Sequence, residues 1–102
     1  MQNMKIITWN VNGIRSRIFN DNISSKLKKN TSIVPEESSA IQKLLSEFNP
    51  DILCIQETRC GLEKSKTICI PGYNSFFNES KLEGARSADR YSGTAVFYKQ
   101  DM

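Results

Sequence analysis

Short apolar stretches bounded by turn-forming residues divide the chain into predicted strands. Residues 5–9, Lys-Ile-Ile-Thr-Trp, are mostly β-branched or aromatic and stop shortly before an Asn-Gly turn signal, which predicts a short buried strand. Residues 51–56 are almost continuously apolar, as is typical of a strand covered on both faces. Two further strands are predicted at residues 73–77 and 93–98.

Between the first two of these strands the pattern changes to that of a helix. Pro35 suits a first helical turn because its missing N–H would have no partner there, and Glu36 and Glu37 complement the helix dipole. One apolar face follows, made of Ala40, Ile41, Leu44, Leu45 and Phe48. Asn49 and Pro50 then end the helix.

The segment at residues 16–32 is polar and carries clustered lysines. Phe19, Ile23 and Leu27 are spaced four residues apart, so they would form one stripe of a helix. Two alternatives therefore stay open for this segment, a loose helix or a mobile loop.

The order of these elements predicts an α/β (α+β) fold in which helices cover a mixed sheet. Leu44 on the helix and Leu53 on the second strand should both be buried. The last predicted strand has no element after it and would leave an unpaired edge, which folded proteins usually cover. On that ground we expect a truncated gene product or a part of a longer protein.

Composition narrows the functional classes only slightly. Hydrophobic residues make up 38% and charged residues 25%, and no apolar run is long enough to cross a bilayer, so we expect an intracellular protein with no membrane partner. The net charge of +3 mildly favours a polyanionic partner. Cys54, Cys60 and Cys69 lack paired spacing, and Cys54 is expected to be a buried hydrophobe. No histidine is present, which argues against a zinc site and against an imidazole general base within these residues.

Polar residues gather where the first two predicted strands end. Asn10 and Asn12 would point the same way from an extended segment, Gly13 permits a sharp turn, and Arg15 offers a fork suited to phosphate. Glu57 follows the second strand directly. Carboxylate and amide oxygens suit Mg²⁺, which commonly takes only one or two carboxylates.

Each cluster also has a structural alternative, because an Asn-Gly pair is usually a turn and a Gln-Glu-Thr segment is often a solvated loop. Their joint occurrence after two apolar strands favours a functional site.

Three motifs resemble the exonuclease III branch of the endonuclease/exonuclease/phosphatase superfamily. They are residues 7–15 (Ile-Thr-Trp-Asn-Val-Asn-Gly-Ile-Arg), residues 50–59 (Pro-Asp-Ile-Leu-Cys-Ile-Gln-Glu-Thr-Arg) and residues 91–93 (Tyr-Ser-Gly). The resemblance implies a four-layer α/β/β/α sandwich, with residues 1–102 as the N-terminal part of one domain. It implies a Mg²⁺-dependent apurinic/apyrimidinic endonuclease of base excision repair, with Mn²⁺ as a substitute metal and 3′-exonuclease activity in addition. Its partner would be double-stranded DNA with abasic sites, and the full-length protein would be a monomer.

The resemblance also implies residue roles. Glu57 corresponds to the catalytic, metal-binding glutamate, Asn10 to a catalytic asparagine of the phosphate pocket, and Asn12 to a residue near the metal. The implied DNA contacts are Arg15, Arg59 and Tyr91.

The sequence also departs from the family pattern. The stretch between Arg15 and Pro50 is longer than usual, which indicates an insertion at about residues 16–35. The family's later catalytic elements, a tyrosine, an Asp-x-Asn pair and an Asp-His pair, do not occur here, so residues 1–102 alone are expected to be inactive. The rivals are a non-catalytic remnant or nucleic-acid-binding module of the same fold, and a retrotransposon-type endonuclease. The cellular site would be the nucleus in a eukaryote and the cytoplasm in a bacterium or virus.

Overall fold

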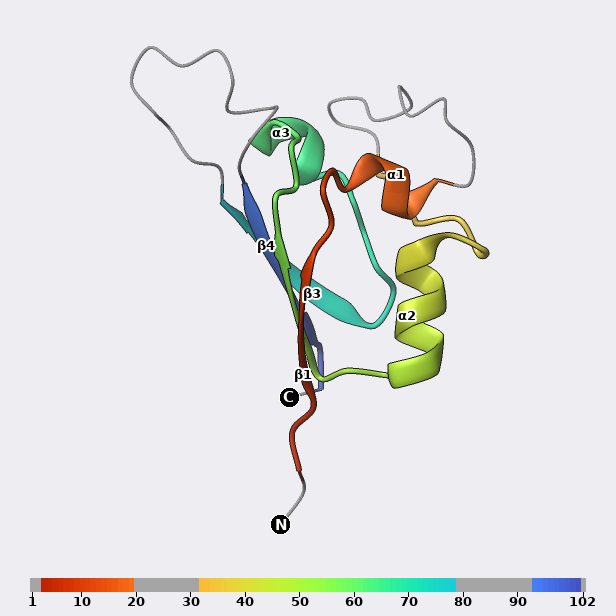
Figure 1. The fold of residues 1–102 in the computed structure, drawn as a ribbon. Coiled ribbons are helices and arrows are strands. Elements are labelled where there is room, and N and C mark those ends of the chain that lie inside the picture. Colours follow the sequence, from red (N-terminus) through yellow and green to blue (C-terminus); the bar gives the residue numbers. More distant parts are fainter. Residues whose placement is uncertain (1–2, 20–31, 79–92, 102) are drawn as a thin grey trace.

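The computed structural model describes residues 3–19, 32–78 and 93–101, which build one mixed sheet with helices against it (Figure 1). Its four strands run in the order β1-β2-β4-β3. The parallel pair β1–β2 is joined through the helical segment, whereas β4 is antiparallel to both β2 and β3. The strands are β1 (Ile6–Asn10), β2 (Ile52–Gln56), β3 (Tyr73–Asn78) and β4 (Thr94–Lys99). The predicted α/β class is confirmed.

The position of β4 corrects the expectation of an unpaired last strand. Ala95 pairs with Ile55 of β2 on one side and with Phe77 of β3 on the other. Within the described residues the sheet edges are β1 and β3. The first strand is consequently an edge strand and is less buried than predicted, with Ile6 56% exposed.

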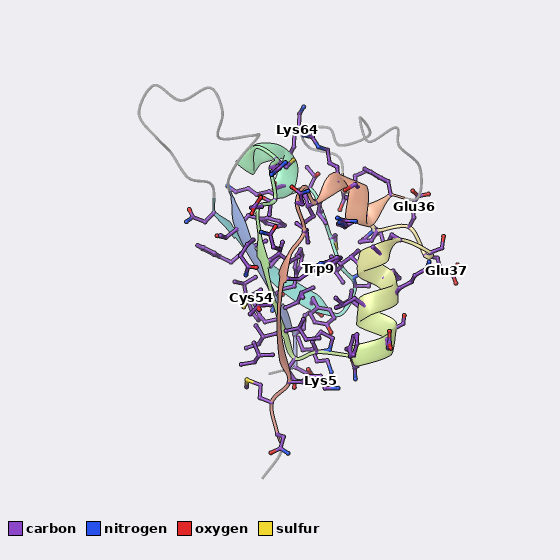
Figure 2. All side chains as sticks on the ribbon, viewed as in Figure 1. Lys5, Trp9, Glu36, Glu37, Cys54 and Lys64 are labelled. Carbon is purple, nitrogen blue, oxygen red and sulfur yellow. The ribbon has the colours of Figure 1, made fainter. Side chains whose placement is uncertain are left out.

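The main helix, α2 (Ala40–Phe48), begins later than predicted. Ser39 is its N-cap, and the Ser39 hydroxyl accepts a hydrogen bond of 3.3 Å from the Gln42 N–H. The proline and the two glutamates precede this cap; Figure 2 shows Glu36 and Glu37 beside the start of α2, on the side away from the sheet. The predicted end is confirmed, because Asn49 is a left-handed C-cap with φ 45°.

Two shorter helices lie at one end of the sheet, beyond the carboxyl ends of β1 and β2 (Figure 1). The single-turn helix α1 (Arg15–Ile18) lies next to the N-terminal end of α2 (Figure 1). A second short helix, α3 (Leu62–Ser65), was not predicted. Of residues 16–32, the segment with two open alternatives, residues 16–19 and 32 are described, and Ile18 and Phe19 are buried. Ile33, just beyond this segment, forms a parallel bridge with Ile68. Residues 20–31, including Ile23 and Leu27, lie outside the described residues.

The core lies between α2 and one face of the sheet. Leu53 and Phe97 are paired on β2 and β4, and both are fully buried, which for such side chains is worth roughly 1.5–3 kcal/mol each relative to exposure. From α2, Ile41 and Leu45 reach this face. Leu44 is only half-buried, so the prediction for Leu44 was wrong while that for Leu53 is confirmed.

The opposite face of the sheet is far more exposed. Burial alternates along β2, so the strand is not covered on both faces as predicted, and Cys54 is half-buried. Cys54 and Trp9 point to opposite sides of the sheet (Figure 2). Phe76 is 66% exposed and Tyr98 is 38% exposed on the Cys54 side. None of the helices among the described residues is long and apolar enough to cross a membrane.

Candidate active site at the ends of β1 and β2

The two polar clusters meet because β1 and β2 are parallel and in register. Asn10 is the partner of Gln56 at the carboxyl ends of the two strands. Pairing then continues into both loops: the Gly13 N–H donates to the Glu57 carbonyl at 2.8 Å, and the Ile14 N–H donates to the Thr58 carbonyl at 2.9 Å. The loops that carry the predicted site residues are therefore held side by side by backbone hydrogen bonds.

Asn10 contacts Glu57 directly. The Asn10 amide group donates through Nδ2 to Glu57 Oε2, and Asn10 Oδ1 accepts a 3.1 Å bond from the Asn12 backbone N–H. Two bonds of opposite sense fix which end of the amide faces the carboxylate. The sequence had suggested that Asn10 and Asn12 project alike from an extended segment. That prediction was wrong, because Asn12 is left-handed with φ 51°, and the Asn10 side chain closes an Asx turn by accepting from the Asn12 N–H.

Arg59 forms the second contact of the carboxylate. Its Nη2 lies 3.0 Å from Glu57 Oε1, and Arg15 in turn donates to the Arg59 carbonyl at 3.3 Å. Within the described part of the chain, the Nε of Arg59 is buried without a hydrogen-bond partner. Arg15 and Arg59 thus both lie at the site. Their contacts with DNA phosphates stay predictions.

These contacts control the charge of Glu57. The Asn10 hydrogen bond, followed by the hydrogen bond and charge of Arg59, lowers the pKa of Glu57 below its usual value of 4.5, and partial desolvation opposes this only in part. Glu57 is therefore a carboxylate at neutral pH.

The backbone at Glu57 is unusual. Glu57 has φ 56° and Arg59 has φ 50°, a left-handed backbone conformation that residues other than glycine adopt rarely. Each such residue costs on the order of 1–3 kcal/mol and persists only where its surroundings hold it, which is a pattern of functional sites. Thr58, between them, is buried.

The donor set fits a hard divalent cation. Each Glu57 oxygen accepts one bond in the structure, and a carboxylate oxygen has room for a second partner. Among residues 3–19, 32–78 and 93–101, no three His, Cys, Asp or Glu side chains gather as a metal site. One carboxylate is still enough for Mg²⁺, which completes its shell with waters and substrate phosphates.

Two structural supports of the site were not predicted from the sequence. Arg17 donates through Nε to the Val11 carbonyl at 2.9 Å, and its guanidinium lies 5.9 Å from the centre of the Trp9 ring. Thr58 donates its N–H to the Gly93 carbonyl at 3.1 Å, which connects the β2 loop to the start of β4. Gly93 ends the Tyr-Ser-Gly motif; the predicted DNA contact Tyr91 lies outside the described residues.

Comparison with known proteins shows the family of the chain. Residues 7–102 match the profile of the Endonuclease/Exonuclease/phosphatase family, and the chain belongs to that family. Members of the family are hydrolases, and divalent-metal use is general among them.

Its relatives are DNA nucleases by name. The chain is 33% identical over 101 residues to human DNA-(apurinic or apyrimidinic site) endonuclease 2, covering 96% of this chain and 17% of the human protein. It is 30% identical over 106 residues to an exodeoxyribonuclease of Streptococcus pneumoniae, covering 97% of this chain and 34% of that protein. The chain thus spans about a third or less of the length of these relatives.

Solved structures show the same fold. The chain aligns over 94% of its length with the crystal structure of the Xenopus laevis APE2 catalytic domain, at a TM-score of 0.54 and 30% identity, covering 23% of that chain. It aligns equally far with the AP endonuclease LMAP of Leishmania major, at a TM-score of 0.56 and 27% identity, covering 24% of that chain. The mixed sheet described above is a small part of an AP endonuclease fold.

Proposed function

We propose that the full-length protein is a Mg²⁺-dependent phosphodiesterase that cuts double-stranded DNA at abasic sites, with Mn²⁺ as a substitute and with 3′-exonuclease activity in addition. The observation that carries the proposal is the contact between Asn10 and Glu57, which orients an ionised carboxylate at the ends of two neighbouring strands. Family membership and the names of the relatives support the substrate class.

The residues have distinct tasks in this proposal. Glu57 would hold Mg²⁺, with Asn12 close to the metal, and the ion when bound would supply charge stabilisation at the scissile phosphate. Asn10 keeps the carboxylate in one orientation. Arg15 and Arg59 would bind backbone phosphates. Contacts of arginines with phosphates make the affinity for DNA fall as the salt concentration rises. An abasic nucleotide has no base to unstack, which makes its extrusion into a pocket cheap. The protein would work inside the cell as a monomer.

The direct test is a nicking assay on a duplex with one abasic site beside the same duplex without it. The full-length protein should cut only the abasic duplex endonucleolytically, and EDTA should abolish cutting until Mg²⁺ is restored. Equal cutting of both duplexes would favour a retrotransposon-type endonuclease over a repair enzyme.

A second candidate is a non-catalytic module that binds nucleic acid. It is favoured by the single carboxylate of the described site and by the missing histidine in the sequence. The module would bind the abasic duplex in a salt-dependent way and would leave it intact with Mg²⁺ and with Mn²⁺. Multiple-turnover nicking separates the two candidates.

A further inference from the structure

The turn that carries Glu57 is anchored through one buried residue. Thr58 is 2% exposed, its N–H donates to the Gly93 carbonyl at 3.1 Å, and its carbonyl accepts from the Ile14 N–H at 2.9 Å. Three segments far apart in the sequence are joined at this point: the loop after β1, the loop after β2 and the start of β4. The Thr58 backbone therefore holds the site loops against the sheet.

Its side chain fits against a glycine. Gly93 has φ 106°, and a Cβ built on it would lie 2.1 Å from Thr58 Oγ1 and 3.5 Å from Thr58 Cβ. The first distance is far inside any normal contact, so Thr58 occupies the space that a side chain at position 93 would need. Gly72, in contrast, has φ 86° with nothing within 4 Å of the same hypothetical atom.

We propose that Thr58 and Gly93 are a positioning pair for Glu57, a role that rests on the proposed metal-dependent function. Both residues would act through Glu57. Glu57 and Arg59 are left-handed on either side of Thr58, and such backbone stays in place only when its surroundings fix it. The close packing of Thr58 on Gly93 does this. If the turn is loosened, Glu57 returns to ordinary backbone angles and its carboxylate turns away from Asn10.

The test compares Gly93→Ala with Gly72→Ala in the full-length protein. Both substitutions strain a positive φ, but only Gly93→Ala also collides with Thr58. Mn²⁺ binding is measured from the electron paramagnetic resonance signal of the free ion, a readout that does not depend on nuclease activity. The measurement is made at a temperature at which circular dichroism shows that both variants are folded. Gly93→Ala should weaken Mn²⁺ binding ~10-fold or more, as loss of a supporting contact around a metal ligand does. Gly72→Ala should bind Mn²⁺ like the wild type.

Substitution of Thr58 separates positioning from general destabilisation. Thr58→Ala should also weaken Mn²⁺ binding. Thr58→Ser keeps the hydroxyl group and should bind Mn²⁺ like the wild type. In Thr58→Ala/Gly93→Ala the new methyl group has room, so the double variant should bind Mn²⁺ more tightly than the sum of the single effects predicts. If Gly93→Ala does not fold, the Thr58→Ala and Thr58→Ser pair decides the question.

The inference and the proposed function fail in different ways. If the wild type binds Mn²⁺ and nicks abasic DNA, but Gly93→Ala and Thr58→Ala bind Mn²⁺ as tightly as Gly72→Ala, the positioning role is overturned and the function stands. If the wild type neither binds Mn²⁺ nor nicks, both are overturned. Weaker binding confined to Gly93→Ala and Thr58→Ala, with non-additivity in the double variant, supports both.

Discussion

The side-chain amide of Asn10 donates a hydrogen bond to the carboxylate of Glu57, although the two residues stand 47 positions apart in the sequence. They meet because β1 and β2 are parallel neighbours whose carboxyl ends are in register. Asn10 thereby makes the largest contribution to the lowered pKa of Glu57.

Asn10→Ala should consequently raise the pKa of Glu57 towards its usual value, because the Arg59 contact alone remains to favour the charged form. Because the pKa of Glu57 is lowered in the folded protein, its ionised carboxylate stabilises the fold above the pKa that Glu57 has in the unfolded chain. That contribution to stability is lost as the pH falls through the folded-state pKa of Glu57. The measurement is a carbon-13 NMR titration of the Glu57 carboxyl below neutral pH. Asn74→Ala, at an exposed asparagine of β3, is the control; an unchanged midpoint in Asn10→Ala would contradict the assignment.

Burial in the core predicts unequal effects of two leucine substitutions. Leu53→Ala should cost ~2–5 kcal/mol of unfolding free energy, because Leu53 is fully buried between the sheet and α2. Leu44→Ala should cost clearly less, because Leu44 is only half-buried. Denaturant midpoints of the two full-length variants measure both values. A Leu44→Ala midpoint that falls further than that of Leu53→Ala would show that the helix faces the sheet differently.

Residues 1–102 expressed alone should bind abasic DNA weakly and cleave nothing. The described site offers one carboxylate, and the sequence has no histidine to activate water. Ile6, Phe76 and Tyr98 are moreover exposed on one sheet face, and an apolar patch of that kind favours association over a rigid site. The purified fragment is assayed for nicking beside the full-length protein. Multiple-turnover, Mg²⁺-dependent nicking by the fragment, lost on Glu57→Gln, would place all required groups within these residues.

Local patterns predicted the four strands, whereas only the family resemblance implied that Asn10 and Glu57 belong to one metal and phosphate site. Two apolar strands joined by a helix are parallel neighbours as a rule, so residues at their carboxyl ends come together. The start of α2 was harder to predict, because the sequence holds two acceptable start signals. One is Pro35 followed by two glutamates, and the other is Ser39, which the structure shows to be the N-cap. The fit of Thr58 on Gly93 could not be predicted at all. It depends on β4 entering the sheet between β2 and β3, a long-range pairing that no local pattern encodes.

The proposed function requires Glu57 to hold the metal of a DNA-cleaving site. Glu57→Gln keeps the shape of the side chain and removes its charge, and Glu47→Gln, at an exposed glutamate of α2, is the matched control. Nicking of an abasic duplex by the full-length proteins is measured over a Mg²⁺ titration. Metal stabilisation of the transition state is worth several kcal/mol and 1.36 kcal/mol is a factor of ten, so Glu57→Gln should lose about 100-fold or more in rate, with Glu47→Gln unchanged. Nicking by Glu57→Gln within a few-fold of the wild type at every Mg²⁺ concentration would show that Glu57 does not hold the metal.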